Sequence, residues 1–266
     1  MIKKRAKKVD RKKQDRPCQI LASSDEHRAR AEKLANELGL PVVTESSRDN
    51  TVIQVSKQGL CLCLPDSRGQ VMRMRVDFTS RRWRRRIALV RKEPLIRAMG
   101  KKGDGRNTWV VDATCGLGRD SFLLAAAGFR VLAFEQHPVL FALLADGLQR
   151  AAGQPATRTI AARIELVCAN ACLALPELNQ RPEVIYLDPM FPRQKKSARV
   201  KKDLQIIRAI AGQQQDPATL FDTARRCAPG RIVVKRPRGS GYLVPKAPSY
   251  FLDGPTIRFD IYLRPG

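Results

Sequence analysis

Beyond residue 108, short apolar runs alternate along the chain with longer amphipathic segments. The apolar runs predict strands at 109–113, 130–135, 164–168, 183–188 and 231–235. The longer segments predict helices at 119–127, 138–151, near 197–211 and at 217–227. Strands that alternate with helices form a parallel, doubly wound sheet, and two final runs, 249–252 and 256–263, resemble an antiparallel pair that closes it. We therefore predict a Rossmann-like α/β domain over residues 103–266, with a mostly parallel sheet and antiparallel C-terminal strands.

The first third of the chain follows a different pattern. A strand is predicted at 18–22, and Ser24 fits the N-cap of a helix over 25–38. Three further segments alternate with the period of two expected of half-buried strands, at 51–56, 59–64 and 70–76. Residues 17–78 therefore predict a small N-terminal α/β lobe dominated by antiparallel pairs.

Basic segments flank this lobe on both sides. Residues 1–16 hold nine lysines and arginines and almost no apolar side chains, so we expect a tail that is disordered on its own. Residues 79–102 form a basic connector, in which we expect a helix from about Ile87 to Met99.

Composition points to a polyanionic partner. The 266 residues include 50 lysines and arginines against 25 acidic residues, a formal charge of +25, which favours nucleic acid through phosphate contacts. Seven cysteines without a CxxC pair, together with only two histidines, make no credible zinc set, so we expect no metal and the buried, reduced thiols of a cytoplasmic protein. No apolar run approaches about 18 residues, so no membrane span is expected.

The first strand of the doubly wound domain runs into a glycine loop. Asp112 is followed by Gly116 and Gly118 and then by a predicted helix, an order that lets the backbone approach a ligand at a helix N-terminus. Many S-adenosylmethionine enzymes use this Asp-x-x-x-Gly-x-Gly loop, whereas a dinucleotide-binding oxidoreductase would have Gly or Ala where Ser121 stands. On this loop alone, both cofactors remain open.

Polar residues also end the next two strands. Glu135 suits bidentate hydrogen bonding to the ribose hydroxyls of either cofactor, although a carboxylate that merely starts a helix is the alternative. Asn170 follows the third strand and could bind the edge of an adenine.

The fourth strand ends in Asp188-Pro189-Met190-Phe191, and this segment separates the two cofactor classes. It resembles the Asp/Asn-Pro-Pro-aromatic tetrapeptide of methyltransferases that act on exocyclic amines of nucleobases. Such an amine is a poor nucleophile because its lone pair is delocalised into the ring. The Asp188 carboxylate and the Pro189 carbonyl can accept its two N–H bonds and localise that lone pair, while Phe191 stacks on the base. An oxidoreductase has no use for this arrangement.

Three basic clusters are candidates for RNA contacts. Arg81, Arg82, Trp83 and Arg84 combine guanidinium groups with a stacking ring, although Trp83 could instead anchor the connector on the core. The other two clusters follow the fourth and fifth strands of the domain, and their candidate residues are Arg193, Lys195, Lys196, Lys201, Lys202, Lys235 and Arg236.

Four runs carry a resemblance to a known family: DATCGLGRDSF, YLDPMFPRQKKSARVKK, VVKRP and RFDIY. In this order they are similar, over about residues 60–263, to the bacterial 16S ribosomal RNA (guanine-N2)-methyltransferase J family. The resemblance implies a Rossmann-like enzyme that uses S-adenosylmethionine to methylate N2 of a guanine in small-subunit ribosomal RNA. The cofactor contacts that it implies are Arg119, Asp120, Glu135, Gln136, Asn170, Ala171 and Asp188.

The chain departs from the family pattern in places. It has arginines at 81–89 where the family is rich in glycine, Asn170-Ala171 where two serines are common, and Gln136 where arginine is common. Other functions consistent with the sequence are a non-catalytic RNA-binding or ribosome-assembly protein with a vestigial cofactor fold, and an N6-adenine methyltransferase.

Overall fold

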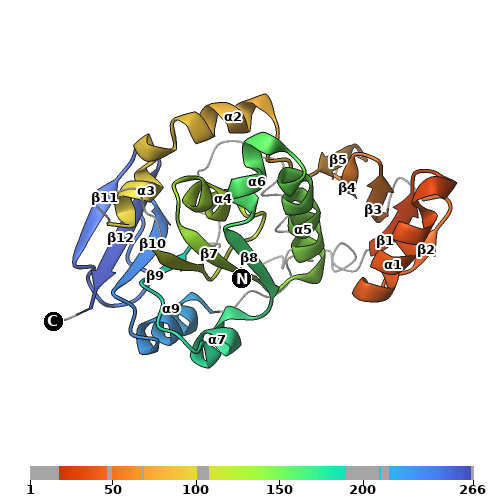
Figure 1. Cartoon of the computed structure of the whole chain (residues 1–266). Coiled ribbons are helices and arrows are strands. Elements are labelled where there is room, and N and C mark those ends of the chain that lie inside the picture. The colour runs from red at the N-terminus through yellow and green to blue at the C-terminus, as the bar shows by residue number, and fades with distance from the viewer. Residues whose placement is uncertain are drawn as a thin grey trace, which may run out of the picture. The chain divides into compact units, whose positions relative to one another are not determined.

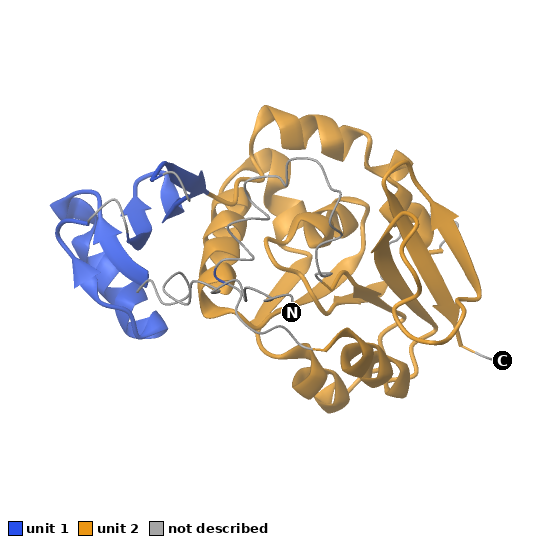
Figure 2. Cartoon of the chain, turned by 180° about the vertical axis from the view of Figure 1, so that it is seen from behind, with its two compact units in different colours: residues 1–74, 200–210 blue, residues 75–199, 211–266 orange. Residues whose placement is uncertain are grey.

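The computed structural model describes residues 18–46, 50–66, 69–100, 108–189, 210 and 216–264. The chain divides into two compact units (Figure 2). The described residues up to Met74 belong to the first unit, together with Ile210, and the other described residues from Arg75 on form the second.

The first unit is a five-stranded sheet with one helix. Its strands, in the order β2-β1-β3-β4-β5, are Val42–Val43, Cys18–Ala22, Thr51–Ser56, Gly59–Pro65 and Val71–Met74. A 3₁₀ turn, η2 (Asp25–His27), leads into α1 (Arg28–Leu38), which ends at Gly39 in the left-handed conformation. Strand β1 pairs in parallel with both β2 and β3, so the sheet is mixed and the predicted dominance of antiparallel pairs is wrong. The parallel pairs arise because α1 returns the chain across the sheet.

The second unit contains the predicted doubly wound sheet. Its seven strands are β6 (Trp109–Asp112), β7 (Arg130–Glu135), β8 (Ile164–Cys168), β9 (Val184–Leu187), β10 (Arg231–Pro237), β11 (Tyr250–Asp253) and β12 (Ile257–Leu263). They lie in the order β11-β12-β10-β9-β6-β7-β8, and the neighbours from β8 to β10 pair in parallel. Strand β12 is antiparallel to both β10 and β11. The predicted fold class is confirmed, including the antiparallel strands at its end.

Helices cover both faces of this sheet (Figure 1). On one face lie α4 (Arg119–Ala126), α5 (Pro138–Ala152) and α6 (Pro155–Ala161), which pack on one another and on β7 and β8. On the other face, α7 (Ala171–Ala174), the turn η4 (Leu175–Glu177) and α9 (Pro217–Arg226) enclose an apolar core. Val111, Ile185, Leu187 and Val234 belong to that core, so the side chains at Asp112, Tyr186, Asp188 and Lys235 alternate to the α4 face.

The connector holds three short helices where one was predicted. They are α2 (Arg81–Ala88), the 3₁₀ turn η3 (Val90–Lys92) and α3 (Pro94–Ala98). Pro94 cannot donate a backbone hydrogen bond and disfavours helical geometry in the residue before it, and Glu93 is indeed extended, with φ −65° and ψ 129°. The prediction of a continuous helix over Ile87–Met99 is therefore wrong.

Residues 75–78 belong to the second unit, not to the small lobe in which we placed them. The Phe78 ring stacks on that of Phe122 in α4, with their centroids 4.1 Å apart. Val76 lies against α5 at Gly147, where a Cβ atom would come within 2.5 Å of the Val76 side chain. These buried contacts bind the segment to the second unit.

The cysteines differ in how far they are buried. All seven cysteines are free, but Cys168 is exposed and only Cys61 and Cys115 are fully buried, so the prediction of seven buried thiols is wrong. None of the helices in the described ranges is long and apolar enough to cross a membrane.

Candidate active site

The polar side chains predicted from the strand ends meet at the carboxyl edge of the second sheet. Strands β6 and β9 are neighbours, but the chain continues from β6 to β7 on one side and from β9 to β10 on the other, and open α/β sheets bind ligands at such a point. Asp112 is opposite Tyr186 in the register, and Val234 is opposite Leu187. The next residues along β9 and β10, Asp188 and Lys235, therefore come side by side.

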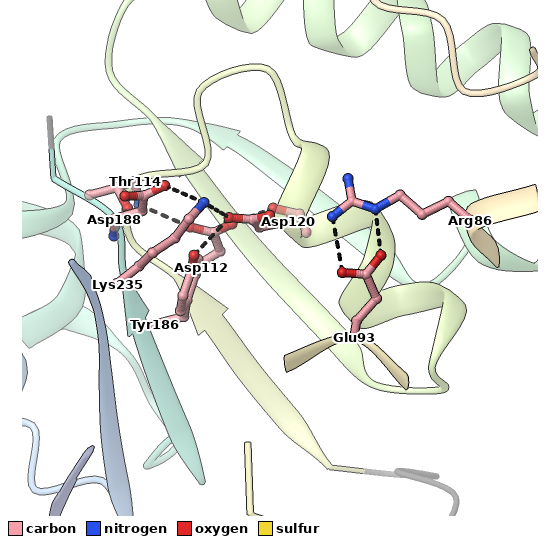
Figure 3. Close-up of polar contacts among 9 residues, drawn as sticks. Arg86, Glu93, Asp112, Thr114, Asp120, Tyr186, Asp188 and Lys235 are labelled. Carbon is pink, nitrogen blue, oxygen red and sulfur yellow. Dashed lines mark hydrogen bonds and ion pairs between the residues drawn. The ribbon is translucent and has the colours of Figure 1, made fainter. Parts of the chain in front are cut away.

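Lys235 joins two carboxylates at this edge (Figure 3). Its ammonium nitrogen donates to Oδ2 of Asp188 at 2.8 Å and to Oδ2 of Asp120 at 2.7 Å. The Tyr186 hydroxyl donates to the same oxygen of Asp120, also at 2.7 Å. One ammonium thus faces two carboxylates, which leaves the cluster with a net negative charge.

The charges of this cluster shift one another. Burial opposes ionisation of Asp120, but the charge of Lys235 and the hydrogen bonds from Lys235 and Tyr186 outweigh it and hold the pKa of Asp120 below its ordinary value. For Asp188, burial outweighs the attraction of Lys235 and raises the pKa. Burial would lower the pKa of Lys235, but the two carboxylates raise it overall, so Lys235 stays protonated.

The glycine loop is shaped by left-handed backbone at two positions. Gly116 has φ 55° and Gly118 has φ 67°, a region that favours glycine. Gly118 also has no room for a side chain, because a Cβ atom there would lie 2.5 Å from Cδ1 of Leu144. Gly118 is the N-cap of α4, so Arg119 and Asp120 form the first turn of that helix.

The Asp112 carboxylate ties the glycine loop to the start of α4. Asp112 is 1% exposed, and its carboxylate accepts hydrogen bonds from the Ser121 hydroxyl at 2.5 Å and from the Thr114 amide at 3.1 Å. Burial raises its pKa to about 7. The sequence predicted Asp112 as a cofactor-binding residue. Its side chain is enclosed by its own loop and the start of α4, so it stabilises the conformation of the loop.

Thr114 connects the loop to the predicted catalytic segment. Its hydroxyl oxygen accepts a hydrogen bond from the backbone amide of Asp188 at 2.6 Å. Sequence reasoning did not single out this threonine. The sequence feature that could have indicated it is a hydroxyl side chain two residues after Asp112, which ends the first strand of the domain.

Glu135 and Asn170 are both held by backbone amides. Glu135 is 8% exposed and accepts from the amide of His137 at 2.7 Å, and burial raises its pKa although amides of His137, Gly116 and Gln136 partly offset this. Asn170 caps α7, since its Oδ1 accepts from the amide of Cys172 at 2.8 Å. That oxygen is therefore committed to the helix.

The predicted RNA-binding residues of the connector have two different environments. Arg81, Arg82 and Arg84 lie on α2 with exposed side chains. Trp83 instead packs edge-on against Phe78 and Phe122, with centroid distances of 5.2 and 5.4 Å. The structure thus shows Trp83 as an anchor of α2 on the core, the alternative to base stacking.

The two candidates at the end of β10 are engaged within the protein. Lys235 is paired with carboxylates as described, and Arg236 is 7% exposed and donates to the carbonyl oxygen of Gly241. Both were expected at RNA phosphates, an expectation that neglected how the sheet would surround them. The remaining candidates, Phe191, Arg193, Lys195, Lys196, Lys201 and Lys202, lie outside the described residues, as do residues 1–16.

The residues at this edge fit S-adenosylmethionine. At Gly116, a Cβ atom would meet no described atom within 4 Å, so the loop presents its backbone to open space beside the first turn of α4. The net negative charge of Asp120, Asp188 and Lys235 suits a cofactor that carries a sulfonium and an ammonium group. Glu135 ends β7 on the same edge, where ribose hydroxyls are bound in doubly wound folds. Fold and site together define an S-adenosylmethionine-dependent methyltransferase.

Comparison with known proteins agrees with this class. The family model described as "Putative SAM-dependent methyltransferase" matches residues 33–264. Ribosomal RNA small subunit methyltransferase J of Thioalkalivibrio sulfidiphilus is 44% identical over 92% of this chain and 96% of its own, and the protein of that name from Nitrosococcus oceani is 42% identical over 88% and 93%. A crystal structure of a SAM-dependent methyltransferase from Neisseria gonorrhoeae aligns with a TM-score of 0.72 and 36% identity, covering 93% of this chain and 96% of that one. The chain belongs to the ribosomal RNA small subunit methyltransferase J family.

Proposed function

We propose that this protein transfers the methyl group of S-adenosylmethionine to the exocyclic N2 of a guanine in small-subunit (16S) ribosomal RNA. The observation that carries the proposal is the placement of Asp188. Its amide is held by Thr114 and its Oδ2 by Lys235, while its side chain remains 36% exposed at the edge where the cofactor loop begins. The names of the relatives support ribosomal RNA as the substrate.

Asp188, Pro189 and Phe191 would each have a separate role toward the acceptor base. Asp188 accepts a hydrogen bond from the guanine amine through Oδ1, and the Pro189 carbonyl accepts the second. Together they localise the nitrogen lone pair, and Phe191 stacks on the base. S-adenosylmethionine, when bound, would supply the electrophilic methyl group to this nitrogen, with the sulfonium sulfur as leaving group, and the amine proton would leave to water.

Cofactor binding is assigned to the residues around the glycine loop and the ends of the next strands. Those residues are Gly116, Gly118, Arg119, Asp120, Glu135, Gln136, Asn170 and Ala171, with Asp188 on the acceptor side. Asp112 supports them by holding the loop. Methyl transfer depends on alignment of the cofactor more than on its activation, because a sulfonium methyl group is already electrophilic.

RNA binding is assigned to the exposed arginines of α2 and to the basic run Arg193–Lys202. The net charge of +25 supports a partner with many phosphates. A substrate of this kind places the protein in the cytoplasm, on the small ribosomal subunit or its RNA.

The proposal is tested by radiolabelled methyl transfer to small subunits from cells that lack the protein, followed by nucleoside analysis. We expect N2-methylguanosine with the wild-type protein and none with Asp188→Ala, which should still bind RNA. The matched control is Asp222→Ala, which changes an exposed carboxylate on α9. Label in N6-methyladenosine would overturn the choice of base, and no label in any RNA would favour a non-catalytic assembly protein.

A further inference from the structure

Lys235 occupies a position that neither the cofactor nor the substrate assignments explain. It lies on β10, one residue after Val234, which pairs with Leu187 at the end of β9, so its side chain comes beside that of Asp188 on the face that carries α4. The Lys235 side chain is 23% exposed and that of Asp120 is 19% exposed, so the ion pair between them is largely shielded from water. Of the lysines in the described residues, Lys235 is the one that bridges two carboxylates.

This arrangement fixes Asp188 at two points, one on its backbone and one on its carboxylate. The backbone amide is held by Thr114, and Oδ2 is held by Lys235. Within the described residues, Oδ1 accepts no hydrogen bond. One oxygen of the carboxylate is therefore used to orient it, and the other is left for a ligand.

The same ammonium ties Asp188 to the cofactor side of the site. Asp120 belongs to the first turn of α4, directly after the glycine loop, and its Oδ2 receives both Lys235 and Tyr186. Lys235 thus spans from the segment that faces the acceptor amine to the helix that borders the cofactor. A shift of either carboxylate would break one of two short, charge-assisted hydrogen bonds.

We propose that Lys235 is a positioning residue for the methyl transfer, which orients the Asp188 carboxylate so that Oδ1 meets the acceptor amine and keeps it in register with Asp120. This inference rests on the proposed function, because it gives Asp188 the role of hydrogen-bond acceptor. Lys235 itself accepts no proton, since an ammonium held by two carboxylates keeps its charge. Its charge also favours the ionised form of Asp188, and an ionised carboxylate stabilises the positive charge that develops on the nitrogen.

The test compares Lys235→Met with Lys235→Arg and with Lys246→Met, which removes an exposed lysine of the same unit. For each variant, kcat and KM for RNA are measured across acid to alkaline pH at saturating cofactor, and circular dichroism checks the fold. Asp112, Asp120 and Tyr186, the groups that interact with Asp188 and Lys235, are unchanged in all three, as is Arg86, which acts on Asp120.

We expect Lys235→Met to lower kcat by about 10- to 100-fold, by analogy with the loss of residues that orient metal-binding side chains. The acid limb of its kcat profile should move to higher pH, because loss of the ammonium makes Asp188 easier to protonate. Lys235→Arg should restore most of kcat and return the acid limb towards the wild-type position, and Lys246→Met should match the wild type.

Two results would overturn the positioning role. One is a Lys235→Met variant with wild-type kcat and pH profile. The other is a folded Lys235→Met variant that loses kcat without any change in the acid limb and is not rescued by arginine. A wild-type protein that transfers no methyl group to any RNA would instead refute the proposed function, and the role of Lys235 with it, so the failures are distinguishable.

Discussion

The amide of Asp188 and the hydroxyl oxygen of Thr114 lie 2.6 Å apart and join the two loops of the site by a hydrogen bond. Thr114 belongs to the loop after β6, which borders the cofactor, and Asp188 opens the segment that faces the acceptor base. The two loops follow neighbouring strands of the sheet, β6 and β9, but the two residues are 74 positions apart in the chain. Their alignment therefore depends on this side chain.

Replacing Thr114 with valine removes the acceptor but preserves the shape of the side chain. An unsatisfied amide should lower the free energy of unfolding by about 1–3 kcal/mol, and methyl transfer should slow because Asp188 loses its fixed position. Thr114→Ser keeps the hydroxyl and should behave like the wild type. Urea denaturation and single-turnover transfer measure the two effects, and a fully active valine variant would contradict this role.

The buried Asp112 should make stability depend on pH. Its pKa is raised to about 7 in the folded protein, above its value in the unfolded chain, so the folded state binds the extra proton. Stability from this group is fully present below the unfolded pKa and is lost as pH rises through about 7. Since a tenfold change in an ionisation constant corresponds to about 1.4 kcal/mol, the loss is at most about 4 kcal/mol.

The variant Asp112→Asn carries no charge and should lack this pH dependence. Urea denaturation of both proteins from acid to neutral pH isolates the contribution as the difference between their curves. That difference should favour the variant increasingly as pH approaches neutrality. Parallel curves would contradict this and show that the pKa of Asp112 is the same in the folded and unfolded states.

Alanine at the two loop glycines should have different consequences. Both positions have positive φ, so each substitution costs about 1–2 kcal/mol of backbone strain. Gly118→Ala also drives a methyl group into Leu144, which adds about 1–3 kcal/mol of overpacking. Gly116→Ala meets no described neighbour and should instead weaken binding of S-adenosylmethionine. Thermal unfolding and calorimetry separate the two effects, and equal stability losses would contradict the packing at Gly118.

The exposed arginines of α2 should govern the salt dependence of RNA binding. Changing Arg81, Arg82 and Arg84 together to glutamine should weaken binding and reduce the slope of log affinity against log salt by about 0.7 per lost phosphate contact on a single strand. The matched control changes three exposed arginines elsewhere in the unit, Arg130, Arg158 and Arg225. Filter binding at several salt concentrations provides the slopes. Equal slopes for the two triple variants would mean that α2 makes no special contact.

The positions of the strands in the second sheet could be predicted from local sequence alone. The bounds predicted for β7 and β8 coincide with those observed. Strand β7 is a buried apolar run, whereas β8 lies at the sheet edge and none of its residues is fully buried. The carboxyl ends of β6, β7 and β9 could also be placed at one edge, which brought Asp112, Glu135 and Asp188 together in advance.

Side-chain partners across the sheet could not be predicted in the same way. A lysine and an arginine at the end of β10 resemble a phosphate site in sequence, but strand register puts Lys235 beside Asp188 and a turn brings Gly241 to Arg236. Trp83 was similarly ambiguous, because its neighbours in sequence are arginines while its neighbours in space are Phe78 and Phe122. Charge is visible in a sequence, but the pairing of charges is a property of the fold.

The packing of Trp83 and Phe78 against Phe122 bears on which nucleotide of the RNA can reach the site. Phe122 lies in α4, the helix that starts at the cofactor loop, so α2 is attached to the same rigid body as Asp188. Phosphates bound by the α2 arginines would then lie at a set span from the methylated base. We expect the choice of nucleotide to depend on that span as well as on the base itself, since a guanine at the wrong spacing could not reach Asp188 without releasing α2.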